Sequence, residues 1–314
     1  MNELVAQPAA SSQQHLSPNQ KAWLRFKRNR PAVIGTWFLL ALALLVVLSP
    51  WIIPYNPNTL TDAQFQPPSA QHWFGTDVHG RDLLARIFAG ARISLLVGAI
   101  GAGVSLLIGV LWGAVAGYVG GRWDSFMMRS VDILYSMPPV IFVIVLVTTL
   151  EARLMGTLVS LHHENWTWLV RIFLLLVGLC SLSWLTTARI VRGQVLSLRN
   201  RQFVEASRTM GAGTLRILRW HILPNVLGVV IVYLTLTVPA IILYESFLSY
   251  LGLGIQPPMA SWGSLIAEGA NQMNPIHIYW WLLAFPAAFL VATLLALNFV
   301  GDGLRDAWDV RGGG

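Results

Sequence analysis

The sequence predicts an all-α polytopic membrane protein with six transmembrane helices. Hydrophobic residues make up 55% of the 314 positions and charged residues only 11%, whereas soluble domains carry about 25% charged residues. A helix needs roughly 20 apolar residues to cross about 30 Å of hydrocarbon. Runs of that kind occupy residues 32–53, 93–118, 131–150, 172–187, 226–251 and 279–300.

The distribution of positive charge predicts how these spans are oriented. With a cytoplasmic N-terminus, 16 of the 21 Lys and Arg residues are inside, as the positive-inside rule requires. The five left outside are Arg81, Arg86, Arg92, Arg153 and Arg171. We therefore expect both termini in the cytoplasm and attribute the net charge of +7 to membrane topology rather than to nucleic-acid binding. A count of five or seven spans would put the C-terminus outside and weaken this asymmetry.

Residues 1–30 are predicted to be a cytoplasmic tail, and residues 31–54 the first transmembrane helix. The first twenty residues are polar, lack the apolar core of a secretory signal and are expected to be disordered. The single cysteine, Cys180, falls in the fourth span, which excludes an intrachain disulfide and favours a role as a small core residue.

Residues 55–92 form the longer of two predicted external segments. A proline-rich stretch comes first, and Leu83, Leu84, Ile87 and Phe88 then recur at helical spacing. This predicts a short interfacial helix before the second span. The alternative is an ordered loop without a helix.

Both external segments contain histidines, which are common metal ligands. His162, His163 and Glu164 are adjacent in segment 151–171, and adjacent side chains rarely ligate one ion well. The other pair, His72 and His79, is seven residues apart, and the neighbouring Gly75 and Gly80 favour turns. No metal site is predicted from either set.

Glycines follow one face of the second span at Gly109, Gly113, Gly117 and Gly121. Small residues four apart allow another helix to approach closely within a membrane. No strand pattern precedes these glycines and no Gly-Lys-Ser/Thr follows, so a helix-packing face is predicted rather than a phosphate-binding loop.

Prolines are expected to kink three of the spans. Pro138 and Pro139 fall in the third, Pro239 in the fifth and Pro286 in the sixth. Each removes a helical hydrogen bond, which membrane helices tolerate where neighbours satisfy the freed carbonyl. Bent helices fit a transport path, although purely structural kinks are equally common.

Titratable residues are almost absent from the spans, and Glu245 alone lies well inside one. Proton pumps, ion symporters and intramembrane proteases place carboxylates or histidines near the membrane midplane. One glutamate makes no catalytic pair, so no catalytic residue is predicted. Glu245 and Ser249 are candidates for the translocation path, and a local polar network with Ser246, Ser249 or a neighbouring chain is the alternative.

The basic segment 189–224 is predicted to be a cytoplasmic loop with a docking function. FVEASRTM and GTLRILRW are amphipathic and are separated by Gly211, which predicts two short helices at an angle. The segment carries Arg208, Arg216 and Arg219 and places Ala206, Met210 and Leu215 where they could enter a partner's groove. Binding of anionic lipid headgroups is the alternative.

The stretch EASRTMGAGTLRILRWHILP, residues 205–224, resembles the EAA loop of ABC-importer membrane subunits. In that motif Glu, Ala and a small residue precede Gly by fixed spacing, and an aliphatic residue and Leu-Pro follow. The matching residues here are Glu205, Ala206, Ser207, Gly211, His221, Leu223 and Pro224. Ser207 replaces the second alanine and His221 stands at the usually aliphatic position.

Further segments are similar to the C-type permease of the peptide and nickel branch, most of all the oligopeptide permease. They include FGTDVHGRDLLARIFAGARISL, SFLSYLGLGIQPPMASWG and FVGDGLRDAWD. The resemblance implies a type I importer fold, with a five-helix core over residues 93–301 and a cytoplasmic tail at 302–314. It extends over nearly the whole chain.

The resemblance also implies the partners and the role of the loop. These partners are a homologous B-type permease, two cytoplasmic ATPases that bind ATP and Mg²⁺, and an extracytoplasmic peptide-binding protein, besides membrane lipid; the chain itself binds no cofactor. Residues expected to couple to the ATPase are Glu205, Ala206, Ser207, Gly211, Leu223 and Pro224. Import of dipeptides, other peptides or nickel is the alternative within the family. Outside it, the alternatives are a secondary transporter and an anchoring protein.

Overall fold

The fold is a bundle of long helices in a computed structural model that describes residues 18–160, 167–257, 259–273 and 275–308. The helices, in chain order, are α1 (Pro18–Arg28), α2 (Arg30–Ile52), α3 (Leu83–Val119), α4 (Gly121–Tyr135), α5 (Pro139–Ser160), α6 (Thr167–Leu198), α7 (Gln202–Thr209), α8 (Thr214–Ile217), the π-helical turn η2 (Leu218–Ile222), α9 (Leu223–Tyr250), α10 (Trp262–Asn271) and α11 (Trp280–Trp308). Most of the predicted disordered tail lies outside the described residues.

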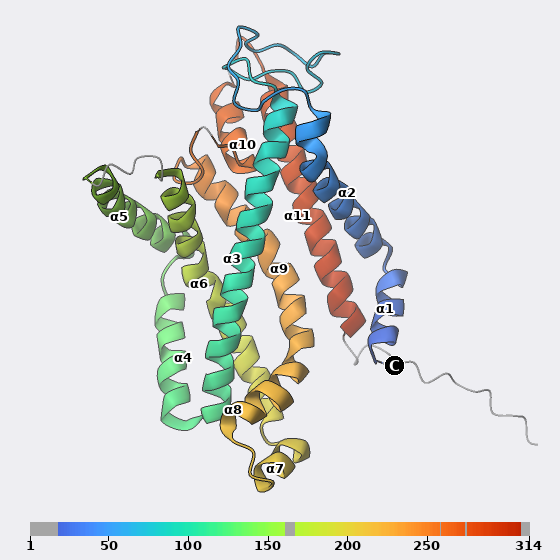
Figure 1. Cartoon of the computed structure of the whole chain (residues 1–314), viewed down its shortest axis with the longest axis vertical. Coiled ribbons are helices and arrows are strands. Elements are labelled where there is room, and N and C mark those ends of the chain that lie inside the picture. Colours follow the sequence, from blue (N-terminus) through green and yellow to red (C-terminus); the bar gives the residue numbers. More distant parts are fainter. Residues whose placement is uncertain (1–17, 161–166, 258, 274, 309–314) are drawn as a thin grey trace, which may run out of the picture.

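Helices α2, α3, α6, α9 and α11 run roughly along one axis, with α3 central and packed on α6 and α9 (Figure 1). On the other side, α11 packs on α2 and α9. The loop 53–82 and α10 lie at one end of the bundle, and α7 and α8 lie at the opposite end (Figure 1). We call the loop 53–82 together with α10 the external cap.

The predicted class of polytopic helical membrane protein is confirmed. Among the described residues, five helical stretches are long and apolar enough to cross a membrane, and the count reaches six if α4 and the first part of α5 form one bent span. The five are Arg30–Ile52, Leu83–Val119, Trp168–Leu198, Thr214–Tyr250 and Trp280–Trp308.

The third predicted span, 131–150, is not one helix. It straddles the break between α4 and α5, where the two helix axes bend by 87°. Pro138 and Pro139 explain the break, because neither has an amide hydrogen to donate and each disfavours helical backbone in the residue before it. By contrast, Pro239 lies within continuous α9 and Pro286 within continuous α11.

Four boundaries differ from those predicted. The expected interfacial helix at 83–92 is the first part of α3, because Asp82 caps that long helix through a 2.8 Å hydrogen bond from the Ala85 amide. At the other boundaries the helices extend further than apolarity indicates: α6 continues to Leu198, α11 to Trp308, and the expected tail before residue 30 contains α1.

The glycine face of α3 lies against α6. A Cβ atom built on Gly109 would stand 2.6 Å from the Cβ of Thr187, and one on Gly117 would stand 2.9 Å from the Arg192 carbonyl oxygen. A Cβ atom on Gly113 would come closer still, to the carbonyl oxygen of Ala188. Gly121 does not belong to this face, because it begins α4 and no atom lies within 4 Å of its Cβ position.

Candidate functional site

The segment between α6 and α9 forms the end of the molecule that is farthest from the external cap (Figure 1). The two short helices predicted around Gly211 are confirmed as α7 and α8. Gly211 has φ +85°, a backbone conformation that only glycine adopts at little cost. The Gly211 amide donates to the Arg208 carbonyl at 2.9 Å and the Ala212 amide to the Ser207 carbonyl at 3.0 Å, which closes the end of α7.

An apolar core holds this segment to the bundle. Val204 of α7 is fully buried against a cluster that includes Ile217, Leu218 and Ile222. The same cluster continues into α9 through Val226. The inner face of the segment is therefore part of a buried apolar core that continues into the bundle.

The outer face of the segment leaves large apolar side chains uncovered. Met210 is 79% exposed and Leu215 is 78% exposed, and Glu205 and Ala206 are exposed beside them on α7. Clustered apolar exposure at the tip of a molecule is typical of a surface that another protein or a membrane covers.

The predicted coupling residues divide between these two faces. Glu205, Ala206 and Gly211 point outward, whereas Ser207 is buried and Leu223 is half-buried. Pro224 is exposed in the first turn of α9, where the missing amide hydrogen costs no hydrogen bond.

Two arginines connect the segment to the end of α3. The Arg208 guanidinium lies 5.2 Å from the Tyr118 ring centroid, and its Nε is 3.4 Å from the Tyr118 hydroxyl. Arg199 donates to the Gly117 carbonyl at 3.1 Å. The orientation of α7 is thus linked to the α3–α6 pair.

Glu245 lies in a polar cluster between α3, α9 and the start of α10. Its carboxylate accepts from the Ser249 hydroxyl at 2.7 Å and from the Ser94 hydroxyl at 3.1 Å, and its side chain is fully buried. Ser94 in turn accepts from the Trp262 amide at 3.2 Å, and Ser249 accepts from the Ile255 amide at 3.1 Å. Of the two interpretations of Glu245, these contacts describe a local polar network.

A cavity of about 370 Å³ opens elsewhere, between the α4–α5 bend, α6 and α9. Six of its lining residues carry hydroxyl groups, the others are apolar, and none is charged; the six are Tyr135, Ser183, Thr186, Tyr233, Thr237 and Tyr244. Neither Glu245 nor Ser249 belongs to this lining.

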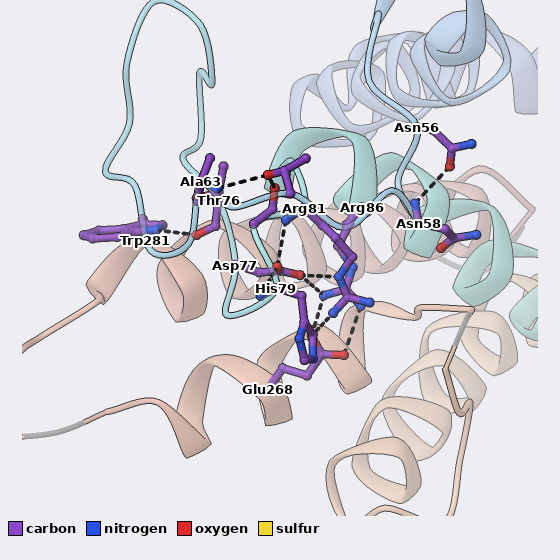
Figure 2. Close-up of polar contacts among 12 residues, drawn as sticks. Asn56, Asn58, Ala63, Thr76, Asp77, His79, Arg81, Arg86, Glu268 and Trp281 are labelled. Atoms are coloured by element: carbon purple, nitrogen blue, oxygen red, sulfur yellow. Dashed lines mark hydrogen bonds and ion pairs between the residues drawn. The ribbon is translucent and has the colours of Figure 1, made fainter.

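Four charged residues lock the external cap together (Figure 2). Asp77 accepts from the Arg81 Nε and from an Arg86 nitrogen, both at 2.7 Å. The Arg86 guanidinium also bridges to Glu268 of α10, with Nη2 3.0 Å from Oε1. The side chains of Asp77, Arg81 and Arg86 are at most 8% exposed, whereas Glu268 is 32% exposed, so three of the four residues are buried and the fourth reaches the surface.

The environment of Asp77 favours its charged form. Burial alone would raise the pKa of this carboxyl, but the Arg81 backbone N–H and the positive charges of Arg86 and Arg81 outweigh it, so the pKa lies below its usual range. Asp77 therefore holds both arginines at neutral pH.

His72 and His79 both lie in loop 53–82, within the external cap. His72 Nδ1 lies 2.8 Å from Asp82 Oδ2, and the His79 amide donates to Asp77 at 2.8 Å. Within the described ranges no group of three potential ligands stands close enough to hold an ion. The triplet that begins at His162 lies outside those ranges.

The chain matches two family models and many curated proteins. Residues 109–311 match the binding-protein-dependent transport system inner membrane component, and residues 17–68 match the N-terminal transmembrane domain of oligopeptide transport permease C. It is 47% identical to the dipeptide transport system permease protein DppC of Bacillus subtilis over 298 residues, 94% of this chain and 87% of that one. It is 48% identical to the oligopeptide transport system permease protein OppC of Escherichia coli K12 over 295 residues, 93% of this chain and 91% of that one.

A solved structure shares the fold. The inward-facing MetNI methionine ABC transporter contains a chain that superposes with a TM-score of 0.53 at 18% identity, covering 69% of this chain and 94% of that one. Together, these matches and the helical bundle show a multi-pass inner-membrane protein that is the non-catalytic partner of ATPase subunits in a binding-protein-dependent transporter. The chain belongs to the OppC/DppC-type permeases of peptide ABC transporters.

Proposed function

We propose that the chain forms half of the translocation path of an ATP-driven oligopeptide importer and couples to a cytoplasmic ATPase through the segment 205–224. A homologous B-type permease supplies the other half. An extracytoplasmic peptide-binding protein delivers the cargo at the external cap, and ATP and Mg²⁺ are bound by the ATPase pair. The names of the similar permeases support peptide as the cargo.

The observation that carries this proposal is the outer face of the segment 205–224. Met210 and Leu215 are exposed there, next to Glu205, while buried residues of the same segment fix it to the bundle. A rigidly held surface transmits the movement of whatever covers it. The charge distribution supports a cytoplasmic position for this segment, where an ATPase would reach it.

Two substitutions test the coupling role. Gly211→Val forces a branched side chain into φ +85°, and Glu205→Lys reverses a charge on the exposed face. Both variants should reach the membrane yet lose ATP-dependent peptide uptake. The matched control is Gly213→Val, because Gly213 has an extended backbone with φ −70° and open space around it. Unchanged uptake in both test variants would exclude this segment as the coupling element.

Dipeptide import is the second candidate. It is favoured because the sequence identity to a dipeptide permease, at 47%, nearly equals the 48% sequence identity to an oligopeptide permease. Mass spectrometry of the ligand retained by the purified binding protein would separate the two. The same experiment tests other peptides and nickel, and uptake that survives ATP depletion but not loss of the proton gradient would instead favour a secondary transporter.

A further inference from the structure

The two residues that depart from the motif in the segment 205–224 contact each other. The Ser207 hydroxyl on α7 lies 3.4 Å from Nε2 of His221 in the π-helical turn η2. That hydroxyl donates its own hydrogen to the Phe203 carbonyl at 2.8 Å. Its lone pairs therefore remain for a hydrogen bond donated by the imidazole.

Both partners are held in place by further contacts. Ser207 is only 3% exposed, and its carbonyl accepts from the Ala212 amide. His221 is half-buried, and its carbonyl accepts from the Asn225 side chain at 2.7 Å. A π-helical turn adds one residue to the helical repeat and is often found at functional sites. Here it places the imidazole at the junction between α7 and α9.

Apolar packing alone leaves the direction of α7 poorly determined. The apolar packing of Val204 in the cluster with Ile217 and Ile222 is non-directional, so it holds α7 against the bundle but does not by itself set the angle of the helix. A hydrogen bond to a buried hydroxyl has a preferred direction and loses strength steeply when misaligned.

We infer that Ser207 and His221 form a positioning pair that fixes the angle between α7 and the start of α9. The inference rests on the proposed coupling function of this segment. A movement of the outer face of α7 is then transmitted to α9 through the Ser207–His221 hydrogen bond. Without that bond, α7 would rotate and α9 would move less. Ser207 and His221 need not touch the ATPase, because they act through the exposed residues beside them.

A double-mutant cycle in the complete reconstituted transporter, with its binding protein, tests the pair. The variants are Ser207→Ala, His221→Leu and the double substitution, and the readout is the ratio of peptide-stimulated to basal ATPase activity. Loss of one hydrogen bond should lower this ratio about fivefold in each single variant. The double variant should also lose about fivefold, whereas independent effects would multiply to about 25-fold.

Conservative variants and a spectroscopic readout separate positioning from folding. His221→Gln keeps a side-chain donor and should retain most of the coupling. Thr209→Ala removes another α7 hydroxyl, one that donates only within its own helix, to Ala206 at 2.8 Å, and should have no effect. The distribution of distances between spin labels at positions 209 and 227 should widen in Ser207→Ala and stay narrow in His221→Gln.

Three results would overturn the inference that Ser207 and His221 act as a pair. They are an unchanged ATPase stimulation ratio in the single variants, multiplicative losses of that ratio in the double variant, or an unchanged distance distribution in Ser207→Ala. These are distinguishable from failure of the coupling role itself. If Gly211→Val and Glu205→Lys abolish stimulation while the Ser207 and His221 variants keep it, the segment couples without this pair. If all four keep it, the proposed function fails as well.

Discussion

Replacing Arg86 with methionine should destabilise the external cap by an amount that can be worked from its contacts. Arg86 is 1% exposed and bonds both Asp77 and Glu268. Removing one partner from a buried ion pair costs about 3–5 kcal/mol. Because Arg81 still neutralises Asp77 in the variant, we expect the lower end, about 3 kcal/mol, and a melting midpoint lowered by roughly 6 °C.

Cys180 offers a direct assay for this variant. It is the one cysteine of the chain and is buried, so a thiol-reactive dye reports unfolding when the other subunits lack cysteine. The matched control is Arg171→Met, because the Arg171 side chain is 41% exposed whereas that of Arg86 is 1% exposed, while their partners Glu151 and Glu268 are similarly exposed at 29% and 32%. Exposed pairs contribute about 0–1 kcal/mol. A shift for Arg86→Met no larger than that for Arg171→Met would refute the view that the network locks the cap.

Three further predictions concern packing, pH and the polar cluster. Gly113→Leu should lower the free energy of unfolding by about 1–3 kcal/mol, because the larger side chain forces α3 away from α6. The same dye measures this change, and Gly103→Leu, whose side chain would face open space, should leave the stability unchanged. Because the pKa of Asp77 is lowered on folding, its contribution to stability should be complete above about pH 4 and lost as pH falls further; proteolysis of loop 53–82 that is unchanged between pH 5 and pH 3 would contradict this. Glu245→Gln keeps an acceptor for Ser249 and should be far milder than Glu245→Leu, which strands buried hydroxyls; equal melting midpoints would argue against the network.

The spans were predictable because apolarity over about 20 residues is a local property that hydrocarbon imposes. Five of the six runs coincide with continuous helices, with at most one residue beyond a helix end. The third does not, because two adjacent prolines, Pro138 and Pro139, interrupt it. Their presence predicts a kink, but the 87° bend also depends on how α5 packs against α6, which no local pattern encodes.

The candidate site was predictable in part for the same reason. The turn at Gly211 follows from a residue type that alone accepts positive φ. The cap network could not be foreseen, since Arg86 and Glu268 stand 182 residues apart. The surroundings of Glu245 were equally hidden, because the Ser94 that bonds it comes from α3, 151 residues away. Long-range pairings of this kind require the packed fold.

The distribution of prolines has a mechanical consequence for the bundle. Neither α3 nor α6 contains proline, whereas α2, α9 and α11 each contain one in their interior. At about 1.5 Å per residue, the 37 residues of α3 span roughly 55 Å. Because Gly109 and Gly117 let α3 and α6 pack at close range, we expect these two helices to move together as one rigid unit. We therefore expect bending to concentrate in the helices around α3 and α6. A tilt of the α3–α6 pair at the end near α7 should then produce the same tilt at the end near the external cap.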